Sequence, residues 1–127
     1  MQLRPGGLHK LRRLFDEHSF WAGDRSTSQL RRMLHGSSAA VSAWDGDNLV
    51  GFGRATTDGV FRAVLWDVVV AGTHQGQGLG RRIVESLLQQ PCVGRAERIY
   101  LMTTNSTGFY EQLGFGVITS QKLMMKI

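Results

Sequence analysis

The chain has 127 residues, a hydrophobic fraction of 42% and a formal net charge of +5. This length suits a single domain with a sizeable core and leaves no room for a second domain. No segment reaches the roughly 18 continuous apolar residues of a membrane span, and the Arg-rich start lacks the apolar centre of a signal peptide. We therefore expect a cytoplasmic protein with no membrane partner. The single cysteine, Cys92, cannot form an internal disulfide, and its neighbours Pro91 and Val93 predict a loop there.

The positive charge is compatible with nucleic acid, a membrane surface or an anionic cofactor as partner. Many of the basic residues alternate with apolar positions, as Lys10, Arg12 and Arg13 do, which is typical of the solvated face of an amphipathic helix. No basic run is interleaved with aromatic residues, as in proteins that bind single-stranded nucleic acid. The sequence therefore favours an anionic small molecule over nucleic acid.

The first half of the chain predicts two helices and then antiparallel strands. One helix opens at residues 5–7 and runs to about His18, and a second is capped by Ser26 or Thr27 and ends near His35. Residues 39–44 and 49–56 have the pattern of a hairpin, because the four residues between them are rich in Asp, Gly and Asn. A second turn at residues 57–59 leads into a strand over residues 60–70.

The most informative segment joins this strand to a helix through a loop with alternate glycines. Residues 68–70 are three consecutive valines, as in a strand buried on both faces, and residues 79–90 have helical apolar spacing. Between them lie Gly76, Gly78 and Gly80, which permit positive φ and leave backbone N–H groups open at the positive end of a helix dipole. The segment predicts a phosphate-binding site.

The spacing of this loop excludes two common nucleotide sites. A P-loop would end in Gly-Lys-Ser/Thr, and neither that lysine nor that hydroxyl is present. The dinucleotide fingerprint would need a third glycine at the position of Arg81, and the chain is too short for two mononucleotide-binding halves. A nucleoside triphosphatase and a Rossmann enzyme are therefore both disfavoured.

The rest of the chain predicts one parallel crossover and a closing hairpin. The helix stops before Pro91, residues 98–103 form the next strand, and a short helix follows Asn105. Residues 115–118 and 121–127 then predict a final hairpin. The expected class is α/β (α+β), with a mixed central sheet, an antiparallel N-terminal meander and flanking helices.

Two ordered motifs resemble the GNAT superfamily of N-acyltransferases. Gln75-x-x-Gly78-x-Gly80 after a Val-rich strand is similar to its acyl-CoA pyrophosphate loop, and Asn105 followed by the stretch from Phe109 to Phe115 is similar to its second hallmark. The segment from Trp66 through the glycine loop most resembles the plastid and cyanobacterial branch that includes serotonin N-acetyltransferase-like proteins. The resemblance implies a single GNAT-like domain over residues 1–127, in which residues 2–4 are at most a remnant of the usual first strand.

The resemblance implies acetyl-CoA as co-substrate and no metal. The strand before the loop would pair with the pantetheine arm, and the loop amides would bind the pyrophosphate. The residues expected to bind the cofactor are Val68, Val69, Val70, Gln75, Gly76, Gln77, Gly78, Leu79, Gly80, Arg81, Asn105 and Tyr110.

Four residues are candidates for the chemistry. The family gives the tyrosine at Tyr110 the role of general acid toward the CoA thiolate; packing beside other aromatic residues is the alternative. Asp67 could accept the proton of the amine, or it could be a structural carboxylate in a buried strand. Phe20 and Trp21 could line the acceptor pocket, or they could be ordinary core residues.

The favoured function is transfer of an acetyl group from acetyl-CoA to a primary amine, by direct attack on the thioester. Resemblance to the serotonin N-acetyltransferase-like branch favours an arylalkylamine such as serotonin. A protein lysine or N-terminus is the alternative acceptor, and a non-catalytic CoA-binding regulatory module is the alternative function. The final strands of such domains often pair across a dimer, so the resemblance is compatible with a homodimer, and the sequence leaves the oligomeric state open.

Overall fold

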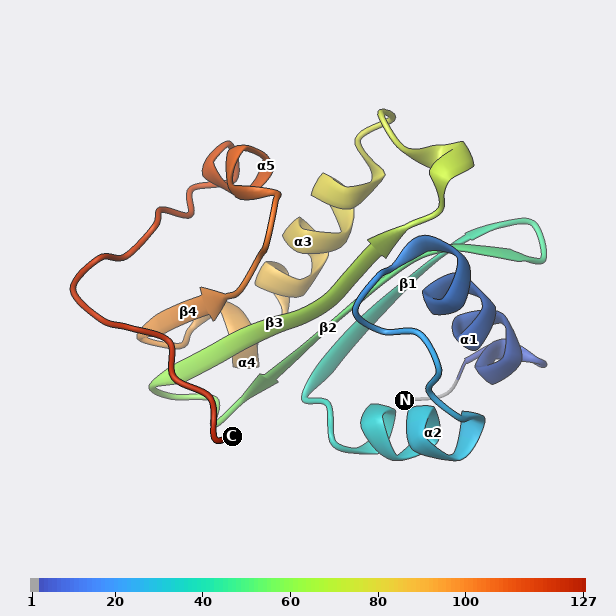
Figure 1. Cartoon of the computed structure of the whole chain (residues 1–127), viewed down its shortest axis with the longest axis horizontal. Helices are drawn as coiled ribbons and strands as arrows, with labels where there is room; N and C mark the ends of the chain where they lie inside the picture. Colours follow the sequence, from blue (N-terminus) through green and yellow to red (C-terminus); the bar gives the residue numbers. More distant parts are fainter. Residues whose placement is uncertain (1–2) are drawn as a thin grey trace.

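The computed structural model describes residues 3–127, which form a central sheet with helices on both faces (Figure 1). The sheet has four strands in the order β1-β2-β3-β4. In chain order the elements are α1 (Gly7–His18), α2 (Thr27–His35), β1 (Ala39–Asp45), β2 (Asn48–Thr57), β3 (Arg62–Val70), the 3₁₀ turn η1 (Gly72–His74), α3 (Leu79–Gln89), α4 (Pro91–Gly94), β4 (Arg98–Leu101) and α5 (Thr107–Glu111). No helix among these residues combines the length and the apolar character needed to cross a membrane.

The two N-terminal helices and the first hairpin are confirmed. Ser26 is the N-cap of α2: its Oγ accepts a hydrogen bond from the Gln29 backbone at 3.1 Å, and the Gln29 side chain accepts one from the Ser26 N–H at 2.9 Å. This reciprocal pair is a capping box, which satisfies two backbone donors that the first helical turn leaves free. The predicted helix is therefore correct, and of its two candidate N-caps, Ser26 and Thr27, the structure selects Ser26.

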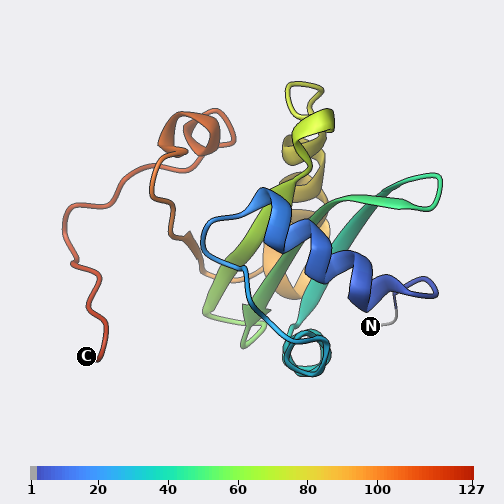
Figure 2. The same ribbon diagram turned by 45° about the vertical axis from the view of Figure 1, so that its right-hand side comes forward.

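The mixed sheet is also confirmed. β1, β2 and β3 form an antiparallel meander, and β3 pairs with β4 in parallel. Two strands that run the same way need a crossover, and α3 and α4 supply it on one face of the sheet while α1 and α2 cover the other (Figures 1 and 2). The sheet thus separates two hydrophobic clusters, one against α1 and α2 and one against α3.

Two glycines in β2 determine how closely α3 approaches the sheet. A Cβ at Gly51 would lie 2.7 Å from Ile83 Cδ1, and one at Gly53 would lie 2.8 Å from Ile83 Cγ2. These distances are shorter than carbon atoms tolerate, so any larger residue would push the helix away. The sequence alone does not predict this role, because a glycine inside a strand indicates a close approach without identifying the element that approaches.

β3 contains a bulge at Asp67. The register shifts between β2 and β3, so that Gly53 alone faces two residues, Asp67 and Val68. Asp67 has a φ of 56°, in the left-handed region. Because of the extra residue, Leu65 and Val68 both pack toward α3, while Asp67 and Val69 face the side of α1 and α2.

The predicted final hairpin is wrong. Residues 115–127 have no regular secondary structure, and the chain runs away from the sheet after α5 (Figure 2). A strand forms only where another strand edge pairs with it, and the sheet of the described residues ends at β4 without pairing to this segment. Leu123, Met125 and Ile127 are consequently exposed.

Smaller corrections concern the other boundaries. β4 ends at Leu101 rather than at residue 103, and Cys92 lies in the short helix α4 instead of a loop, because Pro91 is well suited to start a helix as well as to end one. Of the remnant strand expected at residues 2–4, Leu3 and Arg4 are not in a strand, and Gln2 lies outside the described residues.

Candidate active site

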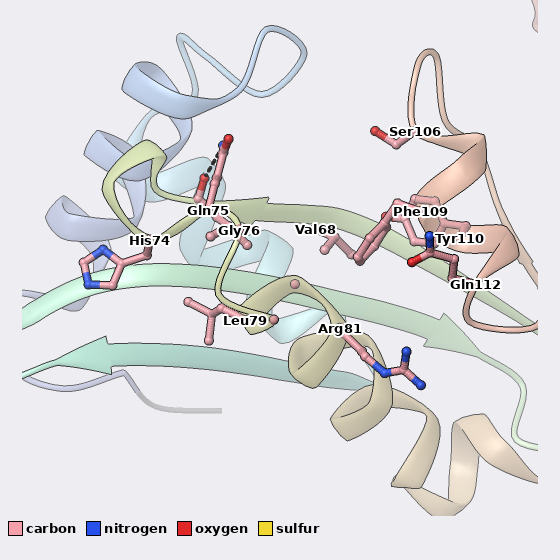
Figure 3. A pocket seen from close by; sticks show the side chains of 13 residues that line it. Val68, His74, Gln75, Gly76, Leu79, Arg81, Ser106, Phe109, Tyr110 and Gln112 are labelled. Carbon is pink, nitrogen blue, oxygen red and sulfur yellow. Dashed lines mark hydrogen bonds between the residues drawn. The ribbon is translucent and has the colours of Figure 1, made fainter.

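A cleft of about 570 Å³ opens where β3 and β4 separate (Figure 3). The parallel pairing ends at Leu65 and Leu101, so the second half of β3 has no neighbouring strand on that side among residues 3–127. The glycine loop, the start of α3 and the short helix α5 surround the gap. The lining residues are Val68, Val70, His74, Gln75, Gly76, Gly78, Leu79, Gly80, Arg81, Ser106, Phe109, Tyr110 and Gln112.

The glycine loop has the geometry of an anion site. Gly76 and Gly78 both have φ of 78°, and Gly78 is the N-cap of α3. Counting from the start of α3, the first backbone N–H that donates a hydrogen bond is that of Arg82, which bonds to the Gly78 carbonyl at 3.1 Å. The preceding N–H groups of the first turn therefore remain open to a ligand, at the positive end of the helix dipole.

Gly80 is required for a different reason from its two neighbours. Its φ is ordinary, but a Cβ there would lie 3.3 Å from Phe109 Cζ. The missing side chain lets α3 lie against α5, so that Tyr110 and the loop border the same cleft.

Gln75 connects the loop to the end of β3. Its side-chain amide donates to the Val70 carbonyl at 3.1 Å (Figure 3). The Ala71 N–H, in contrast, bonds across to the Val50 carbonyl of β2. Because backbone groups alternate sides along a strand, the N–H groups of Val70 and Val68 point into the gap between β3 and β4. These donors are available to a ligand that lies along β3.

Tyr110 lies at the wall of the cleft opposite β3. Its ring makes edge-to-face contacts with Phe109 and Phe115, at centroid distances of 4.9 and 6.0 Å. Burial raises the pKa of the Tyr110 phenol above its ordinary value, so the group is protonated near neutral pH. Its hydroxyl has no hydrogen-bond partner among the described residues. Tyr110 thus combines aromatic packing with a protonated phenol in a residue that lines the cleft.

Only some of the other residues predicted to bind the cofactor line the cleft. Leu79 and Arg81 line the cleft, although the Arg81 guanidinium is also paired with Glu85 at 2.6 Å. Val69 turns its side chain into the core on the other face, and Gln77 and Asn105 lie outside the lining. Their predicted roles as cofactor-binding residues stay predictions.

Four lining residues were not among the predicted cofactor contacts: His74, Ser106, Phe109 and Gln112. His74 is held by Asp45 at the tip of the β1–β2 hairpin, with 3.0 Å between Nε2 and Oδ2. No local motif could have joined these two residues, because they are 29 positions apart. Phe109 and Gln112 belong to the Asn105 motif and lie three positions apart, which puts them on one face of a helix; this spacing was the available signal.

The opposite side of β3 carries an exposed aromatic pair. Phe20 and Trp21, in the loop between α1 and α2, stack edge to face with ring centroids 4.9 Å apart, and they are 70% and 47% exposed. The alternative that they are ordinary core residues is therefore wrong. The Trp21 indole N–H donates to Asp67 Oδ1 at 3.1 Å, which places the pair against the bulge of β3.

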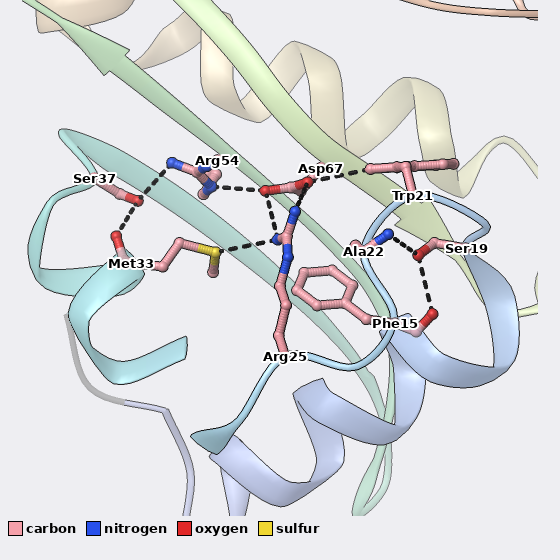
Figure 4. A network of polar contacts seen from close by, with 9 residues as sticks. All are labelled: Phe15, Ser19, Trp21, Ala22, Arg25, Met33, Ser37, Arg54 and Asp67. Carbon is pink, nitrogen blue, oxygen red and sulfur yellow. Dashed lines mark hydrogen bonds and ion pairs between the residues drawn. The ribbon is translucent and has the colours of Figure 1, made fainter. Parts of the chain in front are cut away.

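Asp67 is the centre of a cluster of polar contacts whose other members keep some contact with solvent (Figure 4). Its side chain is 5% exposed and accepts hydrogen bonds from Trp21, Arg25 and Arg54, of which the bond from Arg54 Nε is the shortest at 2.8 Å. Burial alone would raise the pKa of the Asp67 carboxyl, but the hydrogen bonds and charges of the two arginines outweigh it and lower the pKa. The carboxylate is thus ionised and a weak proton acceptor. Its predicted catalytic role is untested.

Comparison with known proteins agrees with this geometry. The chain belongs to the acetyltransferase (GNAT) family, whose model matches residues 8–115. A relative from Pyropia yezoensis, named uncharacterized N-acetyltransferase ycf52, is 34% identical over 85% of this chain and 64% of its own length. The chloroplastic serotonin N-acetyltransferase 2 of Oryza sativa subsp. japonica is 41% identical over 73% of this chain and 49% of its own length. The chain thus spans about half to two thirds of these two relatives, which include the plastid type that the sequence predicted.

Solved structures support the same fold. A putative GNAT acetyltransferase from Xanthomonas campestris pv. campestris superposes with a TM-score of 0.82 at 26% identity, covering 98% of this chain and 86% of that one. An aminoglycoside 6'-N-acetyltransferase solved with coenzyme A has a TM-score of 0.65 at 28% identity, over 77% of this chain and 56% of that one. The GNAT-like fold expected from the two motifs is confirmed.

Proposed function

We propose that the protein transfers the acetyl group of acetyl-CoA to a primary amine, with an arylalkylamine as the favoured acceptor. The observation that carries this proposal is the two-sided construction around β3. One side has an anion-binding loop and a cleft, and the other has an exposed aromatic pair against the same strand. A donor and an acceptor could therefore meet at one strand from opposite sides.

The cleft suits the donor. The open N–H groups at the start of α3 would hold the pyrophosphate, and the N–H groups of Val68 and Val70 would bond to the pantetheine arm or the thioester oxygen. Because these contacts use the backbone, valine side chains are compatible with a reaction centre. The family match and a neighbour that binds coenzyme A support this assignment.

The reaction follows from these positions. The amine nitrogen attacks the thioester carbonyl carbon, and the carbonyl oxygen becomes an oxyanion stabilised by backbone N–H groups of β3. When the intermediate collapses, the C–S bond breaks and the thiolate takes a proton from the Tyr110 phenol. The nitrogen gives up its proton to solvent, directly or through a chain of water molecules, and the Tyr110 phenolate takes a proton back from solvent. The products are an N-acetyl amine and free CoA.

The aromatic pair favours an acceptor with a ring. Phe20 and Trp21 present apolar ring surface to solvent beside the bulge of β3, and an aryl group stacked there would gain about 0.5–1.5 kcal/mol beyond burial of its area. The name of the rice relative, serotonin N-acetyltransferase 2, supports the same class of acceptor.

The direct test is release of CoA by the purified protein with three acceptors: tryptamine, a simple alkylamine of similar basicity, and a lysine-containing peptide. We expect tryptamine to be the best substrate, and Phe20→Ala to raise its KM more than that of the alkylamine. Preference for the peptide would instead support the protein-acetylating alternative. Stabilisation by acetyl-CoA with no turnover would support the non-catalytic module.

We also propose a homodimer, in which residues 117–127 of each copy add to the free edge of β4 in the other. The edge of β4 away from β3 has no partner strand among the described residues, and the C-terminal segment exposes an apolar run of Leu123, Met124, Met125 and Ile127. A second copy supplies both missing partners at once. Light scattering should give a dimer for the full chain and a monomer for Met125→Asp; a full-length monomer would overturn the proposal.

A further inference from the structure

We propose that Asp67 is a positioning residue. Its carboxylate connects the loop between α1 and α2, which carries Phe20 and Trp21, to the bulge of β3. This inference rests on the proposed function, because it assigns a role within the acceptor half of that site. It differs from the prediction that Asp67 takes the proton of the amine.

The first observation is that hydrogen-bond donors fill the Asp67 carboxylate. Oδ1 accepts from Trp21 Nε1 at 3.1 Å and from Arg25 Nη2 at 3.3 Å, while Oδ2 accepts from Arg25 Nη1 at 3.1 Å and from Arg54 Nε at 2.8 Å. A carboxylate has about four lone-pair positions, and four donors fill them here. The amine of an acceptor could deliver a proton only after one of these bonds had broken. Asp67 is therefore arranged to hold donors in place.

The second observation is the conformation of β3. Left-handed backbone is costly for residues other than glycine, and Asp is among those that tolerate it best. At Asp67 this conformation creates the bulge that turns Val68 toward the cofactor cleft, together with Val70. The hydrogen bond from Arg54, which lies on the neighbouring strand β2, ties the bulged residue to the sheet. The side chain thus helps to maintain the shape that exposes the cofactor-side backbone donors.

The third observation is the attachment of the loop between α1 and α2. Trp21 and Arg25 both belong to this loop, and both bond to Asp67 across more than 40 positions in the sequence (Figure 4). The Arg25 side chain also passes over the Phe15 ring, with its Cζ 5.4 Å from the ring centroid. Asp67 consequently fixes where the Phe20–Trp21 pair lies relative to the strand that would carry the thioester.

Three variants test this role. Asp67→Asn removes the charge and leaves one oxygen, which can accept only two of the four hydrogen bonds. Arg25→Gln removes the bidentate pair, and Trp21→Phe removes one donor while an aromatic ring is kept. Arg62→Gln is the matched control, because it breaks an exposed pair with Glu97, at 3.2 Å, on the far part of the sheet. The readouts are KM for tryptamine, kcat, the dissociation constant of acetyl-CoA by calorimetry, and the pH profile of kcat/KM.

A positioning role predicts a shared phenotype. Asp67→Asn and Arg25→Gln should each raise KM for tryptamine by about ten- to a hundredfold, since hydrogen bonds to charged groups are lost, and Trp21→Phe by a smaller factor. The double variant should be less than additive, because the two residues act through one contact. The acidic limb of the pH profile should remain, and Arg62→Gln should resemble the wild type.

A proton-accepting role predicts a different pattern. Asp67→Asn would then lower kcat by about a hundred- to ten-thousandfold and abolish the acidic limb, while Arg25→Gln would leave that limb in place. This result would overturn the proposal.

A measurement without substrate separates this inference from the proposed function. Chymotrypsin should cut the Phe20–Trp21 loop faster in Asp67→Asn and Trp21→Phe than in the wild type and in Arg62→Gln, because the loop has lost its anchor. Faster cleavage would support the positioning role even if no amine proved to be a substrate. Unchanged cleavage in both variants would overturn it even if the enzyme acetylates tryptamine.

Discussion

The two sides of β3 are built in different ways. On the side of α3, the site consists mainly of backbone groups from one continuous stretch, residues 75–81, with Tyr110 opposite. On the side of α1 and α2, it consists of side chains that meet from two loops and strands, with Trp21, Arg54 and Asp67 as examples. A site made from local backbone depends on glycines and a helix start, whereas a site made from distant side chains depends on the tertiary fold.

The largest expected effect is a loss of kcat on removal of the Tyr110 hydroxyl, which lies on the α3 side of β3. Tyr110→Phe keeps the ring contacts but removes the acidic proton, so kcat should fall by about a hundred- to ten-thousandfold, the usual contribution of a general acid. The dissociation constant of acetyl-CoA should stay nearly unchanged in calorimetry. A variant with normal kcat would show that Tyr110 serves only as packing.

The next effect concerns the stability of the other side. Asp67→Asn should lower the free energy of unfolding at pH 7 by about 3 kcal/mol, near the low end for a broken buried ion pair, because both arginines keep some contact with solvent. The folded-state pKa of Asp67 is lowered, so its contribution is complete above the unfolded pKa of about 3.9 and is lost as the pH falls through the folded value. The difference between the two proteins should thus shrink below about pH 4 in urea titrations. A pH-independent difference would contradict this account.

A smaller effect tests the local character of the cofactor loop. Gly78→Ala places a side chain at φ 78°, which should cost about 1–2 kcal/mol of stability and disturb the start of α3. Gly59→Ala is a matched control, since Gly59 has φ of 79° and equally open surroundings but lies in a turn outside the cleft. Both variants should lose similar stability, and only Gly78→Ala should also weaken acetyl-CoA binding. Equal binding by both would show that the loop is not the phosphate site.

The smallest effect concerns the charged side chains near the loop. Arg81 lines the cleft but is also paired with Glu85, whereas Arg82 is exposed outside the lining. Arg81→Gln should weaken acetyl-CoA binding by a few-fold at low salt and less at high salt, because exposed charges are screened. Arg82→Gln should have a weaker effect. The reverse order would show that the Arg81–Glu85 pair withholds the guanidinium from the ligand.

The prediction from sequence succeeded where the signal is local. The capped helix after Ser26, the first hairpin and helix α3 follow from caps, turns and apolar periodicity within a dozen residues. It failed for the final hairpin, because an apolar composition at residues 123–127 indicates a segment able to pair but not the strand edge that it would pair with. The bulge at Asp67 was also missed, since an ordinary alternation was assumed through the central strand.

The sequence by itself determined the cofactor half of this protein. Glycine spacing and a strand-to-helix junction specify a phosphate-binding site through backbone geometry, which depends on neighbouring residues only. The tertiary structure alone decided the acceptor half: that Phe20 and Trp21 are exposed, and that Asp67 is held by Arg25 and Arg54. It also decided, on the cofactor side, that Gly53 makes room for α3. These contacts join residues far apart in the chain, and their energies depend on burial and distance, which exist only once the chain has folded.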